Sequence, residues 1–157
     1  MLRQLGARHD VTKQQTDTYF NLPAGNGARF SRLKLRQQKR SAELIGYSDS
    51  YSGGLRQVDY EVVSASPGIK EVLAGALGIS AIVKKRRELW SLKRTLFNLD
   101  TIEHVGRVFE AEIVLGPGES GDDALRYLDL LGPYLGEQIE GSNEDLVSAL
   151  PLLAKGS

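Results

Sequence analysis

The chain has 157 residues, of which 41% are hydrophobic and 25% charged, and its formal net charge is zero. This composition is that of a globular protein and excludes a disordered or fibrous chain, and the length suits one ordinary domain. No apolar stretch is long enough to cross a membrane, and the absence of cysteine excludes disulfides and thiolate metal sites. We therefore expect a single domain over residues 1–157, located in the cytoplasm and without a membrane partner.

The charges are unevenly distributed along the chain. Residues 1–94 contain 17 Lys and Arg against 8 Asp and Glu, whereas residues 95–157 contain 3 against 12. The first part therefore has a formal charge of +9 and the second −9. An asymmetry of this size indicates either an anionic partner for the first part or pairing between the two parts.

The first part of the chain predicts four strands followed by a helix. Alternating apolar and β-branched residues give the strands, and Ser66 with Pro67 favours a helix start. Gly78 favours the end of this helix. The predicted strands cover residues 16–22, 29–38, 43–48 and 57–63, with a turn at 25–27 and a loop at 49–54.

The second part predicts three more strands and two helices. The last helix begins at Ser142, because "SNED" has the serine-to-acid spacing of a capping box. Strands followed by helices in this order indicate an α+β fold with a mainly antiparallel sheet. The predicted strands cover residues 81–92, 94–100 and 107–115, the last bounded by Gly-Pro-Gly at 116–118, and a helix covers 120–131.

A row of cations marks the second predicted strand. Leu33 and Leu35 alternate with Arg32, Lys34 and Arg36, so one face of the strand is aliphatic and the other basic. Such a face is often simply solvated, or it protects the edge of a sheet from aggregation. The alternative is that it holds an anion.

A second set of charges lies on the later strands. Lys85 and Arg87 share one strand face, as do Glu110 and Glu112, and Asp100 ends the strand between them. Side chains two residues apart on a strand are separated by about 7 Å, so such carboxylates can share a divalent cation. Taken alone, the glutamates also fit a wet strand face, and "KKRR" also fits a nucleic-acid patch.

Together these rows could form a polyphosphate site. A triphosphate needs several fixed cations, and Mg²⁺ is commonly held by one or two carboxylates plus phosphate oxygens. If the sheet closes, the polar faces would point into a lumen and the aliphatic faces would pack outward against the helices. This expectation inverts the usual barrel, whose interior is apolar.

The order of the motifs resembles a known family. "QTDTYF", "RLKLR", "ELIGY", "VKKRRELW", "LFNLDTIEHVGRVFEAE" and "SNEDLV" succeed one another as in the CYTH superfamily of triphosphate-tunnel proteins, closest to class IV adenylate cyclases. The resemblance covers residues 1–147. It implies an antiparallel β-barrel or tunnel with flanking helices, in which cations hold a triphosphate and acidic residues hold Mg²⁺ or Mn²⁺.

Matched residue by residue, the resemblance implies roles for nine side chains. The implied phosphate ligands are Arg32, Lys34, Arg36, Lys85, Arg87 and Arg94. The implied metal ligands are Glu110, Glu112 and Asp100, and the implied catalytic residues are Lys85, Arg87, Glu110 and Glu112.

The chain also departs from the family pattern. The family begins with an E-x-E-x-K strand, whereas this chain begins with "MLRQLGA", which resembles the helix after that strand. The family's arginine and histidine before the aspartate appear here as Leu96 and Asn98. Either the start is shortened from an active design, or the tunnel has lost its chemistry and keeps anion binding. A barrel incomplete at its N-terminus would expose two edges, which predicts filling by a partner strand or a homodimer.

The resemblance implies binding of a nucleoside triphosphate or polyphosphate with divalent metal. An active protein would convert ATP to cyclic AMP and pyrophosphate, as class IV adenylate cyclases do. A triphosphate hydrolase and a non-catalytic polyphosphate-binding module are the alternatives, and the sequence leaves the question of catalysis open. Nucleic-acid binding is disfavoured, because aromatic residues are not interleaved with the cations as stacking platforms would require.

Overall fold

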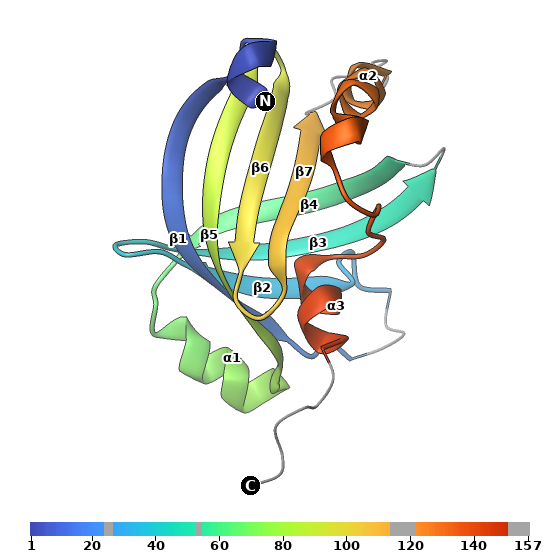
Figure 1. Ribbon diagram of the computed structural model, residues 1–157. Helices are drawn as coiled ribbons and strands as arrows, with labels where there is room; N and C mark the ends of the chain where they lie inside the picture. The colour runs from blue at the N-terminus through green and yellow to red at the C-terminus, as the bar shows by residue number, and fades with distance from the viewer. Residues whose placement is uncertain (24–26, 53–54, 114–121, 151–157) are drawn as a thin grey trace, which may run out of the picture. The chain divides into compact units, whose positions relative to one another are not determined.

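The computed structural model describes residues 1–23, 27–52, 55–113 and 122–150 (Figure 1). Seven strands are ordered β4-β3-β2-β1-β5-β6-β7, and the strand pairs with a described register are antiparallel. The α+β fold and its antiparallel sheet are as the sequence predicts. The chain forms two compact units, unit 1 with Met1–Lys13 and Lys85–Gly141, and unit 2 with Gln14–Lys84 and Ser142–Ser157.

Two strands contribute residues to both units. These are β1 (Arg8–Phe20) and β5 (Ile79–Leu92). Unit 2 further contains β2 (Arg32–Gln37), β3 (Ala42–Ser52), β4 (Leu55–Ala65), α1 (Ile69–Leu77) and α3 (Asn143–Ser148). Unit 1 further contains the 3₁₀ helix η1 (Leu2–Leu5), β6 (Thr95–Ile102), β7 (Gly106–Ile113), α2 (Asp122–Leu131) and the 3₁₀ helix η2 (Gly132–Tyr134).

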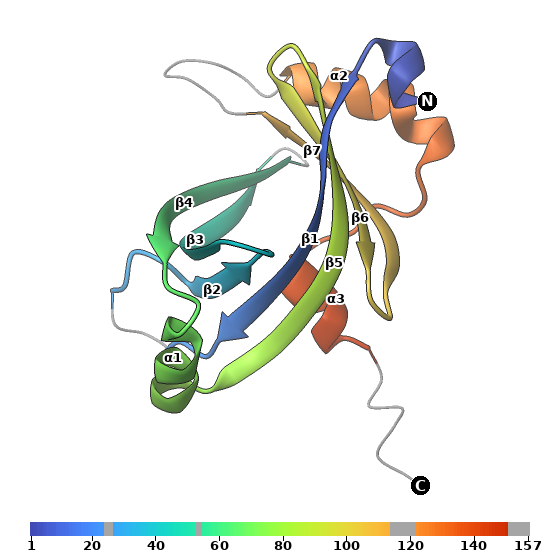
Figure 2. The same cartoon turned by 90° about the vertical axis from the view of Figure 1, so that its left-hand side faces the viewer.

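The core of unit 2 lies between the sheet and α1. Phe20, Leu35 and Ala42 are buried, and the apolar side of α1 packs against them through residues that include Leu73 and Leu77. Figure 2 shows α1 beside the strands of this unit. The two leucines of the basic strand thus lie on the helix side, because strand side chains alternate between faces. The cations of β2 lie on the opposite face.

Unit 1 repeats this construction with other elements. Phe97 of β6 is fully buried and packs with Leu2, Ala7 and Leu131, which come from η1, the residue before β1 and the end of α2. Its ring also stacks on that of Phe109 in β7, with 5.9 Å between the centroids. In both units the aliphatic strand face therefore packs against helices, as the alternation predicts.

Several predicted boundaries differ from the structure. β1 begins at Arg8, eight residues before the predicted start. The prediction missed this first half because it is almost entirely polar and so lacks the alternation of apolar and polar residues that indicates a strand. Residues 49–52, predicted as a loop, continue β3 and pair with β4. The helix predicted from Ser66 begins only at Ile69. The predictions for residues 25–26, 53–54, 114–118 and 120–121 lie outside the described residues.

The predicted end of α1 and the predicted start of α3 are both confirmed. Gly78 ends α1 with a positive φ of 74°, a conformation that suits glycine. At α3 the capping box is complete, since Ser142 and Asp145 each accept a hydrogen bond from the other's backbone N–H. Among the described residues, no helix has the length and apolar character needed to cross a membrane.

We expect Leu35→Ala to destabilise the protein by about 2–5 kcal/mol, because Leu35 is fully buried and truncation leaves a cavity. The matched control is Val72→Ala on α1, whose side chain is 68% exposed and whose loss should cost about 0.5 kcal/mol or less. Urea denaturation monitored by circular dichroism measures both. Equal effects of the two substitutions would contradict this assignment of the core.

Candidate functional site

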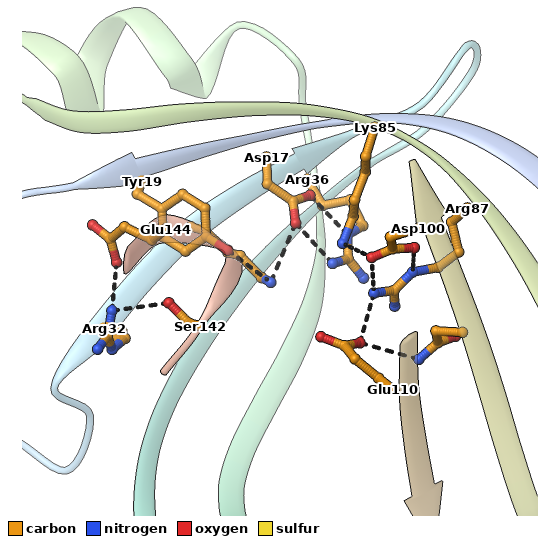
Figure 3. A network of polar contacts seen from close by, with 12 residues as sticks. Asp17, Tyr19, Arg32, Arg36, Lys85, Arg87, Asp100, Glu110, Ser142 and Glu144 are labelled. Atoms are coloured by element: carbon orange, nitrogen blue, oxygen red, sulfur yellow. Dashed lines mark hydrogen bonds and ion pairs between the residues drawn. The ribbon is translucent and has the colours of Figure 1, made fainter. Parts of the chain in front are cut away.

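A buried aspartate holds two cations of β2 in unit 2. Asp17 on β1 is fully buried and lies directly opposite Arg36 in the strand register. Nε and Nη2 of Arg36 donate to the two carboxylate oxygens of Asp17 at 2.8 Å each, and Nζ of Lys34 lies 3.3 Å from Oδ2 (Figure 3). One carboxylate therefore fixes two neighbouring cations of the basic strand.

Two tyrosines flank the same lysine. Nζ of Lys34 lies 5.3 Å from the ring centroids of both Tyr19 and Tyr47, a distance at which cation–π attraction acts. Burial, with smaller contributions from the nearby Tyr47 and Asp17, raises the pKa of the Tyr19 hydroxyl well above its usual value. Tyr19 therefore stays neutral beside the ammonium group of Lys34, whose side chain is largely enclosed.

Arg32, the third cation of β2, contacts the C-terminal helix instead. Its guanidinium donates to Ser142 (3.1 Å), Glu144 (2.9 Å) and Asp145 (2.9 and 3.0 Å) at the start of α3. Burial lowers the pKa of Arg32, but hydrogen bonds to Asp145 and Glu144 outweigh it and raise the pKa overall. Internal carboxylates thus occupy the side chain that was predicted to bind phosphate.

Unit 1 contains an equivalent arrangement around Asp100 on β6. Nζ of Lys85 lies 2.9 Å from Oδ2, and Arg87 donates from Nε and Nη2 to the two oxygens at 2.7 and 2.6 Å (Figure 3). Lys85 and Asp100 are almost completely buried. Burial would raise the pKa of Asp100, but the hydrogen bond and charge of Arg87, and then Lys85, lower it overall.

The predicted pair of glutamates adjoins this cluster. Nη2 of Arg87 donates to Glu110 at 2.9 Å, and Nδ2 of Asn98 donates to Glu112 at 2.7 Å and to Glu110 at 3.4 Å. Burial lowers the pKa of Arg87, but Asp100 and the two glutamates outweigh it and raise the pKa overall. The strand register thus brings Asp100, Asn98 and both glutamates onto the face opposite the core of unit 1.

The two clusters differ in composition. In unit 2, Asp17 binds Lys34 and Arg36, and Glu43 lies opposite Arg36 in the strand register. In unit 1, two cations lie beside three carboxylates; these residues are Lys85, Arg87, Asp100, Glu110 and Glu112. A divalent cation bound by the glutamates would make the second cluster more attractive to an anion.

The two glutamates on β7 are side chains of the kind that binds a divalent cation. Among the described residues, no group of three or more His, Cys, Asp and Glu side chains is placed to hold a metal ion. Glu110 and Glu112 provide two carboxylates, and Mg²⁺ is commonly bound by one or two carboxylates plus phosphate oxygens and water. Both oxygens of Asp100 already accept hydrogen bonds from Arg87.

The remaining predicted residue lies at the glutamate end of this cluster. Arg94 is exposed in the turn between β5 and β6, two residues before Leu96, which pairs with Glu112 in the register, and six residues before Asp100. Sequence reasoning missed the roles of Asp17 and Asn98, and also the acidic residues of α3. For Asp17 a signal existed, because it is the last acidic residue before the basic strand and an antiparallel hairpin would place it there.

We expect Asp100→Asn to cost about 3–5 kcal/mol of stability at pH 7, because it leaves buried cations without their counter-charge. The folded-state pKa of Asp100 lies below its ordinary value. Its stabilisation is therefore present above about pH 3.9 and is lost as the pH falls through the folded-state pKa. The stability difference between wild type and variant should accordingly shrink below about pH 3.9.

Urea denaturation between pH 7 and pH 3 measures this difference. Asp59→Asn is the matched control, because Asp59 pairs with Arg29 at an exposed position, and it should cost about 1 kcal/mol or less. A cost for Asp100→Asn no larger than the control, or one that does not change with pH, would contradict the ion-pair assignment.

Several solved structures have a fold similar to that of this chain. The match to the PH1012 protein of Pyrococcus horikoshii covers 93% of this chain and 89% of that protein, at 21% sequence identity and a TM-score of 0.75. The match to a candidate adenylate cyclase of Vibrio parahaemolyticus covers 94% of this chain and 88% of that protein, at 15% identity and a TM-score of 0.64. A candidate adenylyl cyclase of Hippeastrum is described as having a dominant triphosphatase activity. The match to it covers 83% of this chain and 80% of that protein, at 18% identity and a TM-score of 0.58.

These similarities show a shared fold. The comparison with curated proteins gave no match. The sequence profile of the CYTH domain, however, matches residues 1–142 and so includes both aspartate-centred clusters. The chain belongs to the CYTH domain family.

Proposed function

We propose that this CYTH domain binds a triphosphate-containing small molecule together with Mg²⁺ or Mn²⁺. The observation that carries the proposal is the cluster of unit 1, where two immobilised cations adjoin two glutamates. The carboxylates weaken the attraction of a free polyphosphate to Lys85 and Arg87. A divalent cation bound by the glutamates would add two positive charges and so favour polyphosphate binding.

Each residue of this cluster has a distinct proposed role. Arg87 and Lys85 contact phosphate oxygens, and Glu110 and Glu112 hold the divalent cation. Asp100 is proposed as a positioning residue, because its oxygens bind Lys85 and Arg87 and fix both side chains. The bound cation supplies charge neutralisation for the phosphates and their leaving group.

The cluster of unit 2 is proposed as a phosphate contact in its own right. Asp17 holds Lys34 and Arg36 side by side on the face opposite the core of unit 2. Arg32 would join them only where phosphate replaces the carboxylates of α3. The sequence-based expectation that the cations of all strands face one enclosed space stays a prediction, as does the assignment of Arg94.

The products formed after binding would identify the reaction. Attack of the ribose 3′-hydroxyl on the α-phosphorus of ATP breaks the bond to the β-phosphate and gives cyclic AMP and pyrophosphate. Attack by water gives inorganic phosphate or pyrophosphate without a cyclic product. Neither product, together with tight binding, identifies a non-catalytic module. The Hippeastrum protein of similar fold supports testing for triphosphate hydrolysis first.

Three other expectations stay predictions. These are a partner strand or a homodimer, a cytoplasmic location and the absence of nucleic-acid binding. An affinity for oligonucleotides that falls steeply with salt would contradict the last of these.

We expect Mn²⁺ to increase the affinity of the wild type for tripolyphosphate, and Glu110→Gln to reduce this increase by about 10- to 100-fold. The substitution removes a metal ligand, but it also removes a negative charge beside Arg87. In EDTA the variant should therefore bind tripolyphosphate at least as tightly as wild type. Isothermal titration calorimetry with and without Mn²⁺ measures both effects.

The matched control for this measurement is Glu103→Gln, an exposed glutamate of unit 1 that should leave the Mn²⁺ effect unchanged. If Glu110→Gln leaves the Mn²⁺ effect intact, the glutamates do not hold the cation. If wild type binds equally well in EDTA and Mn²⁺, the charge argument fails.

A further inference from the structure

Between residues 58 and 62, the two faces of β4 carry opposite kinds of side chains. Asp59 and Glu61 point to one face, where both pair with Arg29. The other face carries three apolar residues at consecutive same-face positions, and all three are exposed. This apolar strip consists of Val58 (38% exposed), Tyr60 (55%) and Val62 (43%).

The strand register places the strip on the cationic face of unit 2. Arg32 pairs with Tyr47, which in turn pairs with Tyr60. Lys34 is connected to Val62 in the same way, through Ile45. Two strand spacings amount to about 10 Å, so the strip runs parallel to the row of cations at that distance (Figure 2 shows β2, β3 and β4).

An apolar strip in this position calls for a physical reason. Single exposed apolar residues are common on any protein surface. Here, however, three of them follow one another along one strand face, while Asp59 and Glu61 point the other way. Arg56, the next residue on the face of the strip, pairs with Asp49, which lies opposite Val58. The face that holds cations would be expected to continue with polar side chains if it only met water. A contiguous exposed apolar surface beside polar groups is typical of a binding site.

Resting on the function proposed above, we propose that the strip binds the aromatic heterocycle of a nucleoside triphosphate whose phosphates contact the cations of β2. The phenol ring of Tyr60 offers a stacking surface, and Val58 and Val62 flank it on the same face. Charge complementarity fixes the orientation of the ligand. The anionic phosphates are attracted to the cations, and the uncharged base can lie on the apolar strip. The ligand is thereby an organic triphosphate and not inorganic tripolyphosphate.

The test compares two ligands, ATP and tripolyphosphate, by calorimetry in Mn²⁺. Wild type should bind ATP about tenfold more tightly, within the range for one base–aromatic stack. Tyr60→Ala should lower the affinity for ATP about tenfold and leave that for tripolyphosphate unchanged. Tyr60→Phe keeps the ring and should behave as wild type. Val63→Ala, an exposed residue on the other face of β4, is the control and should change neither affinity.

Each contrary result has a defined meaning. Tripolyphosphate binding without a preference for ATP, or equal losses for both ligands in Tyr60→Ala, overturns the strip as a base site and leaves the proposed function standing. A Tyr60→Ala variant that changes from dimer to monomer by light scattering, with its ATP preference intact, assigns the strip to self-association and also overturns the proposal. Failure of wild type to bind either ligand refutes the proposed function together with the strip.

Discussion

The site depends on one constraint, which is that cations removed from water need a fixed counter-charge. Asp17 and Asp100 meet this need in the same way, each binding two cations that lie two residues apart on a neighbouring strand. Losing one partner of such a buried group is far more costly than losing an exposed pair. The aspartates therefore both stabilise the fold and set the directions of the four cations.

The same alternation that builds the cores also builds the clusters. In β2 the leucines pack towards α1, and Lys34 and Arg36 consequently point to the opposite face. In β6, Phe97 packs with η1 and α2, and Asn98 and Asp100 point away from them. A strand shifted by one residue would bury its charges among leucines, so core packing strongly specifies the register that forms each cluster.

Much of this arrangement could be predicted from sequence, and the failures have physical causes. The period-two patterns of β2, β5 and β7 predicted strands with cations or glutamates on one face, and those strands are present. Partners across strands could not be predicted, because sequence periodicity says which face a side chain takes but not its neighbour. For that reason the contact of Arg32 with α3 was missed, although the capping box at Ser142 was recognised.

The most direct test of the account is a crystal structure with tripolyphosphate and Mn²⁺, with manganese located by its anomalous scattering. The account predicts a manganese peak at the carboxylates of Glu110 and Glu112 and phosphate oxygens within hydrogen-bonding distance of Arg87, with Asp100 still bound to Lys85. Manganese bound elsewhere, or a tripolyphosphate that does not contact these cations, would contradict it.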